Sequence, residues 1–466
     1  MPLTVTCWHG PQLTPARPPP TLVRQTRAVR SVRNTRRPED PNRMWEDRMQ
    51  RRWYTAGAII AGLAMVATAC TGGTGGGGGT TKGEIIVASD QPTSGGDASD
   101  GIPAQNGIQF AVEQAGSIKG FKLTFKGWDD TVNGNHDPQK GAQNIQEMIA
   151  DAKILGMVGP NNSNVARAMI PIANRASFVM ISAANTNECL TQTFPYCEAD
   201  TGTTPAKLRP NGVNNYFRIA AADTFQGPAA ADYAVDTLKA TKVAVWSDNE
   251  TFGKGVADKF STELQKKGGT VVVRQDFDTK TTNDWKPFLT DAKNKGAQAI
   301  YAGATSGTKI CIPRAQMKGI LDVPYMVPDG GVNAQCIKDA AESAANMYGT
   351  VAAADANQNP DAKATIDAFK ARFTKKEDVG SYTFPAYDCA KILIDAIGRA
   401  IDANGGNLPS REQVRKAVSE TKNFKGTTGT YTFDPNGDPT SPTMAIFQTK
   451  GSPLDWVFVK QFGVGG

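Results

Sequence analysis

Histidine is scarce in this chain: only His9 and His136 occur among its 466 residues. A Ser-His-Asp or Cys-His catalytic centre would have to use His136, because His9 lies in an N-terminal segment without apolar periodicity. No GxSxG motif places a serine on a strand-to-helix turn for such a centre. We therefore predict no catalytic residue, and neither a catalytic nor a metal-binding role is expected of His136.

Sequence motifs for cofactors and metals are missing as well. No GxxxxGK(S/T) loop is present, and no GxGxxG segment leads from a strand into a helix. The cysteines lack CxxC spacing, which argues against a zinc site. The sequence thus predicts no cofactor and no metal. A hydrolase of the α/β class that uses carboxylates alone remains the alternative from another functional class.

The basic residues are unevenly distributed along the chain. The net charge is +6, but residues 1–53 hold eleven arginines and only four acidic residues. The rest of the chain is therefore close to neutral. A neutral body offers no basic surface for phosphates, so no nucleic-acid partner is expected.

Apolar runs are short apart from one stretch, residues 54–69, which follows the basic segment MQRRW. This order of a positive region, a compact apolar region and small residues is typical of a secretory signal. We predict a lipoprotein signal peptide over 49–69, with a signal anchor that stays in the membrane as the alternative. Residues 1–48 are predicted to be a disordered leader or the result of a start assigned too early, with Met49 or Met44 as the true start.

The segment ATAC, which ends at Cys70, resembles the lipobox of bacterial lipoproteins, in which the cysteine is acylated. It is followed by the glycine-rich segment TGGTGGGGGTTKG, which is typical of a flexible linker. We therefore predict a lipidated Cys70 and a linker over 70–83. An acylated, exported protein would lie on the outer face of the cytoplasmic membrane.

Seven cysteines are present. Cys7 lies in the leader and Cys70 is assigned to lipid, so five remain in an oxidising compartment that permits disulfides. Cys189 and Cys197 flank a short polar loop, and we predict that they pair. Cys311 with Cys336 is the second predicted pair, and Cys389 lies in an apolar pattern typical of a buried thiol. Spacing alone does not determine which cysteines pair.

From Glu84 onward, short β-branched runs alternate with amphipathic helical stretches. The runs are EIIVAS, KLTFKGWDD, ILGMVGP, FVMISA, VAVWSD, TVVVRQDF, AIYAGA and VPYMVPD. This alternation predicts an α/β fold with doubly wound parallel sheets. About ten strands are too many for one small sheet, so two lobes are expected. Ligands of such sheets bind at the carboxyl ends of the strands, and the segments there are rich in Gly, Ser, Thr, Asn and Asp.

Several segments resemble one family in their order along the chain: GGDASDG, GWDDTVNGNHDPQKGAQNIQEMI, GMVGPNNSNVARAMIPIANR, FVMISAANT, VAVWSDNETFGKG, VPDGG and GTYTFDPNGD. They resemble the leucine/isoleucine/valine-binding proteins, the type I periplasmic solute-binding proteins of branched-chain amino acid ABC importers. The resemblance implies two doubly wound lobes joined by a three-crossing hinge near Ile219, Ala352 and Pro439. It assigns residues 84–219 and 353–439 to lobe 1, and residues 220–352 and 440–466 to lobe 2.

The same resemblance implies a ligand site between the lobes. Family members bind the ligand carboxylate with a serine that matches Ser163 and with a turn that matches Ala184 and Thr186. An acidic residue that meets the ligand ammonium matches Asp329. Ser163 could instead cap the helix that follows it, and Asp329 could start a turn.

Aromatic residues of the family's pocket are only partly kept. Phe252 stands where the family has a tyrosine, and Asp100 and Thr305 stand at two other aromatic positions. These replacements predict a pocket more polar than one built for leucine. Trp246 and Trp285 are expected in the core.

Small-molecule capture implies further partners. The resemblance implies ABC permease and ATPase subunits, an amino acid as the ligand, and contact with the membrane through the lipid anchor. A ligand sensor of the same fold that reports to a membrane receptor is the alternative.

Overall fold

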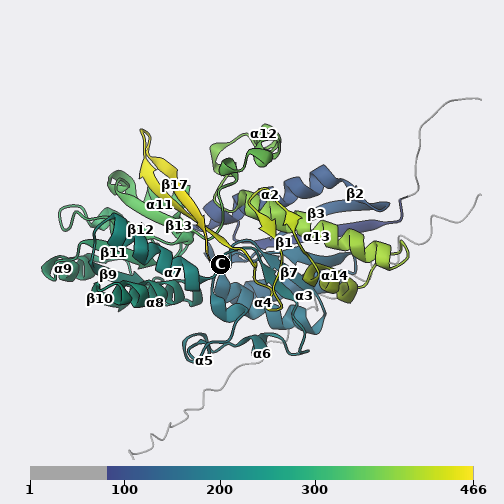
Figure 1. Ribbon diagram of the computed structural model, residues 1–466, viewed down its shortest axis with the longest axis horizontal. Helices are drawn as coiled ribbons and strands as arrows, with labels where there is room; N and C mark the ends of the chain where they lie inside the picture. Colours follow the sequence, from purple (N-terminus) through teal and green to yellow (C-terminus); the bar gives the residue numbers. More distant parts are fainter. Residues whose placement is uncertain (1–80, 465–466) are drawn as a thin grey trace, which may run out of the picture. The chain divides into compact units, whose positions relative to one another are not determined.

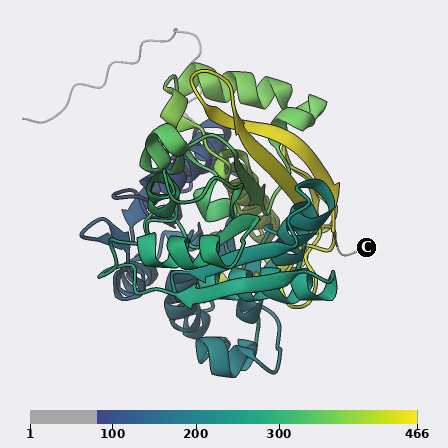
Figure 2. The ribbon, with the colours of Figure 1, turned by 90° about the vertical axis from the view of Figure 1, so that its left-hand side faces the viewer.

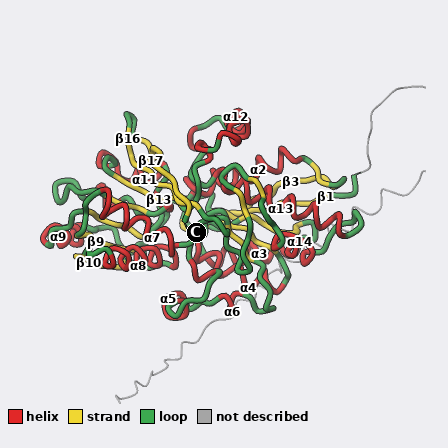
Figure 3. Tube along the Cα trace, viewed as in Figure 1, coloured by secondary structure: helices red, strands yellow, loops and turns green. Residues whose placement is uncertain are grey.

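The computed structural model of the protein describes residues 81–464, except the side chains of Asp200 and Thr201. The predicted leader 1–48, the signal peptide 49–69 and Cys70 lie outside the described residues. The described part is built on two sheets, and Figure 3 shows their strands flanked by helices.

The first sheet has six strands in the order β2-β3-β1-β6-β7-β8. Five strands are parallel, and β2 adds an antiparallel edge. The strands are β1 (Glu84–Gln91), β2 (Ser117–Ile118), β3 (Phe121–Asp129), β6 (Ile154–Val158), β7 (Val179–Ser182) and β8 (Tyr216–Arg218). Their apolar sequences fit strands that are covered on both faces.

Helices cover both faces of this sheet (Figure 1). Side chains alternate along β1, so that Ile85 and Val87 pack in one cluster and Ala88 in another. The first cluster includes residues of α2 (Ala98–Ala115) and α13 (Thr383–Ala403), and the second includes residues of α3 (Pro138–Ala150) and α4 (Ser163–Arg175). We call this sheet with its helices lobe 1.

The second sheet has seven strands in the order β10-β9-β11-β12-β13-β16-β17. Five are parallel, while β16 and β17 are antiparallel strands at one edge and are drawn in yellow in Figure 2. The strands are β9 (Lys242–Ser247), β10 (Thr270–Asp276), β11 (Ala299–Gly303), β12 (Tyr325–Val327), β13 (Met347–Val351), β16 (Thr443–Lys450) and β17 (Asp455–Gly463).

Helices again pack on both faces of the second sheet. Val243 and Val245 of β9 share a cluster with α7 (Asp223–Asp232) and α8 (Thr251–Lys266). Trp246 points to the other face, where it contacts Trp285 just before α9 (Lys286–Asn294). Both tryptophans are fully buried, as the sequence predicted for core residues. We call this sheet with its helices lobe 2.

The chain passes between the two sheets three times. It leaves lobe 1 after β8, returns from lobe 2 after β13, and enters lobe 2 again before β16. The first two crossings lie against each other, because Ala221 N–H donates to Ala352 O at 2.9 Å. The lobe boundaries proposed from the sequence stay predictions.

The remaining elements are short. They are β4 (Thr131–Val132), β5 (Asn135–His136), α5 (Cys197–Thr201), α6 (Pro205–Leu208), α10 (Ile312–Gln316), α11 (Ala334–Ala340), α12 (Lys363–Arg372), α14 (Arg411–Ser419), β14 (Phe424–Lys425) and β15 (Thr430–Tyr431). No helix within residues 81–464 is both long enough and apolar enough to cross a membrane.

Both predicted disulfides are formed. Cys189 pairs with Cys197, and Cys311 pairs with Cys336. Cys389 is a free, buried cysteine in α13, as predicted. The second disulfide ties the residue before α10 to α11 and so braces one face of lobe 2.

Candidate ligand-binding site

Six of the seven predicted ligand residues line one small cavity at the carboxyl ends of the strands, where parallel sheets bind ligands. Its volume is about 20 Å³, which is room for about one water molecule. Both lobes contribute to it. The lining residues are Asp100, Asn161, Asn162, Ser163, Ala184 and Tyr382, with Phe252, Thr305, Asp329 and Gly330 from the lobe 2 segments.

Thr186 is the predicted residue that does not line the cavity. It is fully buried, and its carbonyl oxygen accepts a hydrogen bond from Asp223 N–H at 2.8 Å. Asp223 is the first residue of α7, so this bond ties the turn after β7 to lobe 2. In this structure Thr186 therefore stabilises the turn that carries Ala184.

Ser163 lies at the N-terminal end of α4. The residue before the helix is Asn162, whose side chain makes no capping hydrogen bond, and Ser163 is the first helical residue. The N-terminal end of this 13-residue helix thus borders the cavity. Backbone N–H groups in a first helical turn have no partner within the helix, and the helix dipole favours an anion there.

Asp329 is buried and receives two hydrogen bonds. Gln226 Nε2 donates to its Oδ1 at 2.8 Å, and the hydroxyl of Tyr382 donates to its Oδ2. Burial raises the pKa of Asp329 to about 6, although both hydrogen bonds favour the ionised form. The carboxyl group is therefore mainly ionised at neutral pH and is held in one orientation by residues from different elements.

Asp100 faces the same cavity from α2. It is 3% exposed, and its Oδ2 accepts a hydrogen bond from Asn333 Nδ2 of lobe 2 at 2.7 Å. Its Oδ1 has no hydrogen-bond partner within the described part of the chain. Burial raises the pKa of Asp100 well above its usual value, and the nearby carboxyl groups of Asp97 and Asp329 raise it further.

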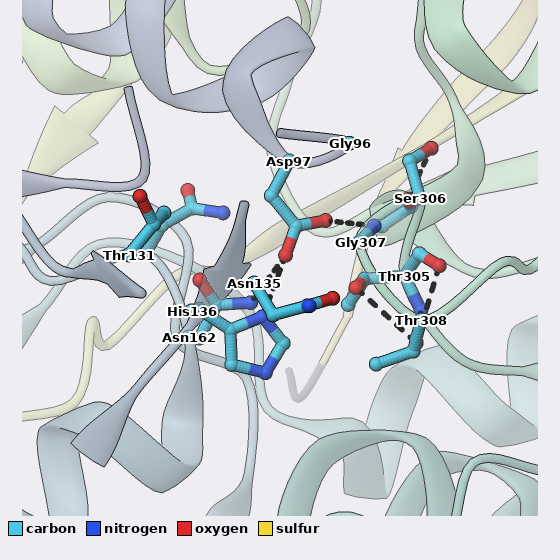
Figure 4. A network of polar contacts seen from close by, with 12 residues as sticks. Gly96, Asp97, Thr131, Asn135, His136, Asn162, Thr305, Ser306, Gly307 and Thr308 are labelled. Atoms are coloured by element: carbon cyan, nitrogen blue, oxygen red, sulfur yellow. Dashed lines mark hydrogen bonds and ion pairs between the residues drawn. The ribbon is translucent and has the colours of Figure 1, made fainter. Parts of the chain in front are cut away.

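A second polar network joins the lobes beside the cavity (Figure 4). Asp97 Oδ2 lies 2.6 Å from His136 Nδ1, and Asp97 Oδ1 accepts the backbone N–H of Gly307 at 2.6 Å. A side chain at position 307 would meet the Asp97 carboxyl group, so glycine permits this close approach. On its other side, His136 Nε2 lies 2.7 Å from Glu250 Oε2, and Glu250 also accepts from Asn164 Nδ2 at 2.9 Å.

His136 is charged in this network. Burial by itself would lower the pKa of His136, but the hydrogen bonds to Asp97 and Glu250 raise it well above its usual value. His136 also holds the pKa of Asp97 below its ordinary value, against the effect of burial. The lobes are therefore joined by an ion triad, Asp97–His136–Glu250.

Sequence reasoning missed several residues of this region. His136 was examined only as a catalytic candidate, whereas the structure places it between the lobes in β5. Tyr382 and Gln226, which orient Asp329, were not predicted. The sequence gives a partial indication for Tyr382, because this residue directly precedes the apolar helix α13. Gln226 lies within α7 and carries no comparable signal.

The sequence and the architecture match a known family. The sequence pattern of the periplasmic binding protein family matches residues 84–453. This chain belongs to that family. The match spans both lobes and the three crossings, so the periplasmic binding protein fold accounts for nearly all of the described residues.

Curated relatives agree with this assignment. The Leu/Ile/Val-binding protein homolog 3 of Brucella melitensis is 28% identical over 370 residues, which cover 78% of this chain and 91% of the relative. The Leu/Ile/Val-binding protein BraC3 of Rhizobium johnstonii is 27% identical over 374 residues, which cover 80% of this chain and 93% of the relative. These family members share almost their whole length with the present chain.

Solved structures show the same fold. The leucine binding protein LivK from Thermotoga maritima matches with a TM-score of 0.68 and 24% identity, covering 82% of this chain and 99% of that protein. A second match is a solute binding protein of an ABC transporter from Rhodopseudomonas palustris, in complex with p-hydroxybenzoic acid. Its TM-score is 0.66 at 20% identity, and the match covers 82% of this chain and 98% of that protein. Periplasmic binding proteins of this fold thus include members with different ligands.

Proposed function

We propose that the protein is the extracytoplasmic substrate-binding lipoprotein of an ABC importer and that it captures an amino acid or a similar small polar solute between its lobes. The observation that carries the proposal is the interlobe cavity, where Ser163 at a helix N-terminus and the ionised Asp329 line one space. The names of the curated relatives, which refer to leucine, isoleucine and valine, support an amino-acid ligand.

In the proposed complex each end of a zwitterion meets a matching group. The ligand carboxylate lies at the N-terminal end of α4, where Ser163 and the backbone N–H groups of the first helical turn offer donors. The ligand ammonium binds Asp329, which Gln226 and Tyr382 hold in place. A solute that lacks one of these groups leaves a buried polar partner unpaired, and this costs binding free energy.

Capture requires that the lobes move. The cavity has room for about one water molecule, so an amino acid enters only when the lobes separate. The three crossings are the natural hinge for that motion. Closure then re-forms interlobe contacts such as Asn333 to Asp100, which shield the ligand from solvent.

The remaining parts of the proposal concern the protein's surroundings. Cys70 would carry the lipid that holds the protein on the outer face of the cytoplasmic membrane. The flexible linker 70–83 would allow the lobes to move relative to the membrane surface. ABC permease and ATPase subunits would be the partners that receive the solute. The protein itself would catalyse no reaction.

Substitution of Asp329 tests the site. Asp329→Asn keeps the shape but removes the charge opposite the ligand ammonium. Loss of one side of a desolvated charge pair costs about 2–5 kcal/mol, or roughly 30- to 5,000-fold in affinity. Ser163→Ala is expected to weaken binding less, because backbone donors remain. A thermal-shift screen over amino acids and small amides identifies a ligand, and isothermal calorimetry then measures each variant.

Asp90→Asn is the matched control for this test. Like Asp329, Asp90 is buried and has a raised pKa, but it lies in lobe 1 and does not line the cavity. This control is expected to bind as wild type does. If Asp329→Asn binds within about threefold of wild type, which is well under 1 kcal/mol, the proposed role of Asp329 is wrong.

A further inference from the structure

Several buried hydrogen-bond acceptors line the cavity. Two carboxyl groups, those of Asp100 and Asp329, line it, and none of the described lining residues is Lys, Arg or His. Among the aliphatic and phenylalanine side chains, only Ala184 and Phe252 contribute. An aliphatic ligand side chain would bring no hydrogen-bond donor to these carboxyl groups.

Asp100 carries the clearest unused acceptor. Its Oδ2 accepts a hydrogen bond from Asn333, and its Oδ1 is buried without a partner within residues 81–464. The side-chain oxygens of Asn161 and Asn162, which line the same cavity, are also unpartnered there. A buried acceptor without a donor costs about 1–3 kcal/mol, and more when it is charged. Three such oxygens around one cavity indicate a ligand that brings N–H donors.

We propose that Asp100 accepts a hydrogen bond from the side chain of the bound amino acid, so that the ligand carries an amide or ammonium group there. Leucine, isoleucine and valine have no such donor. The inference rests on the proposed function, because it assumes that Asp329 and Ser163 already hold the ammonium and carboxylate of an amino acid. It adds Asp100 as the residue that selects the side chain.

The energetics favour such selection. An aliphatic side chain would leave Asp100 Oδ1 desolvated and unpaired, whereas an N–H donor pairs it. Sites built to hydrogen-bond a substrate group discriminate strongly against analogues that lack the group. Burial raises the pKa of Asp100 well above its usual value, so the empty site disfavours the ionised form, and a bound cation would reverse that preference.

A series of amino acids of similar shape tests the proposal. L-Leucine, L-asparagine and L-aspartate have nearly the same outline, but their side chains are apolar, amide and anionic. L-2,4-Diaminobutyrate adds an ammonium group at similar length. Calorimetry on the purified protein is expected to show binding of asparagine or diaminobutyrate at least about tenfold tighter than leucine, with aspartate the weakest. The two favoured probes separate an amide from an ammonium ligand.

Variants connect the preference to Asp100. Asp100→Asn keeps the shape but cannot become an anion when a donor binds, and it is expected to bring the preferred probe to within about threefold of leucine. Asp90→Asn, a buried acid outside the cavity, should leave the wild-type order unchanged. Circular dichroism melting curves establish that each variant is folded.

The outcomes separate this inference from the proposed function. If leucine binds wild type as tightly as or more tightly than asparagine and diaminobutyrate, the role of Asp100 is wrong while amino-acid capture stands. If Asp100→Asn keeps the wild-type order of ligands, the assignment to Asp100 is likewise wrong. If neither an amino acid nor a small amide binds wild type, the proposed function fails together with the inference.

Discussion

His136 connects two carboxylates that belong to different lobes, Asp97 and Glu250. Its side chain is 2% exposed, as is that of Asp97, while Glu250 is 26% exposed. A buried ion pair costs desolvation, which the mutual attraction must offset. The triad therefore contributes mainly to specificity of the closed arrangement, since its geometry exists only when the lobes meet.

The charge on His136 makes the closed form sensitive to pH. A histidine whose folded pKa is raised contributes stability that is fully present below its unfolded pKa of about 6.5 and is lost as pH rises through the folded value. Burial raises the pKa values of Asp130 and Asp248, which also face His136, to about 7. A carboxyl group whose folded pKa is raised loses stability as pH rises from its unfolded pKa of about 4 to the raised value. These two groups therefore also make the folded protein less stable as pH rises, over a range that ends near 7.

We expect the melting temperature of wild type to fall as pH rises from about 6.5 through the raised pKa of His136. His136→Gln keeps a polar side chain of similar length that cannot be protonated. The melting temperature of this variant should therefore depend less on pH over the same range. The two proteins are compared by scanning calorimetry at matched ionic strength. Equal pH dependence in both would show that His136 does not carry the effect.

At the scale of elements, the loops that follow the strands carry the site, and two disulfides cross-link segments of the chain outside the cavity lining. The bridge Cys189–Cys197 closes a segment of 8 residues after β7, and Cys311–Cys336 closes one of 25 residues in lobe 2. Cross-linking restricts the unfolded chain, and the restriction grows with the length of the closed loop. The longer bridge should therefore contribute more to stability.

Removal of each disulfide tests this ranking. Chain-entropy estimates give a loss of about 2.5 kcal/mol for a Cys189→Ser/Cys197→Ser variant and about 3.5 kcal/mol for a Cys311→Ser/Cys336→Ser variant. Urea unfolding followed by circular dichroism measures both losses. Cys389→Ser, which breaks no bond, serves as the control. A larger loss from the shorter bridge would mean that local packing outweighs loop entropy.

Sequence patterns predicted the strands and helices well, because each element depends on the pattern of apolar residues within its own segment. The strands β1, β6, β9 and β11 are short apolar runs bounded by turn residues, and burial on both faces imposes that pattern. The carboxyl-end rule directed attention to the segments that hold Ser163 and Asp329, and the family resemblance assigned them ligand roles and added Asp100, before any contact was known. The same rule says nothing of which side chain along a turn points inward, and Thr186 lies outside the lining for that reason.

At the scale of the whole molecule, two lobes are joined by three crossings, and the candidate ligand cavity lies between them. For import, the proposed lipid on Cys70 would keep these lobes near a permease. Cys70 lies outside the described residues, so its role rests on the signal-like segment before it.

Cys70→Ala is expected to release the protein from the membrane if the anchor is lipid. Cells that express the variant are fractionated, and the protein is located by immunoblot beside wild type. Cys389→Ser, which alters a buried thiol far from the N-terminus in sequence, controls for general effects of cysteine loss. A Cys70→Ala protein that stays with the membrane as firmly as wild type would mean that another element anchors it, as in the signal-anchor alternative.

The sequence by itself determined the alternation of strands and helices, because that pattern depends on residues near one another in the chain. It also indicated both disulfide pairs and, through the family resemblance, the loops that form the site, although spacing alone does not determine which cysteines pair. Tertiary structure alone decided which polar groups meet. Gln226 reaches Asp329 across 103 residues and Asn333 reaches Asp100 across 233, and no local pattern encodes such pairs. The ion triad of His136 likewise exists only where the two lobes close, because its three charges are stable without water only when each finds the others.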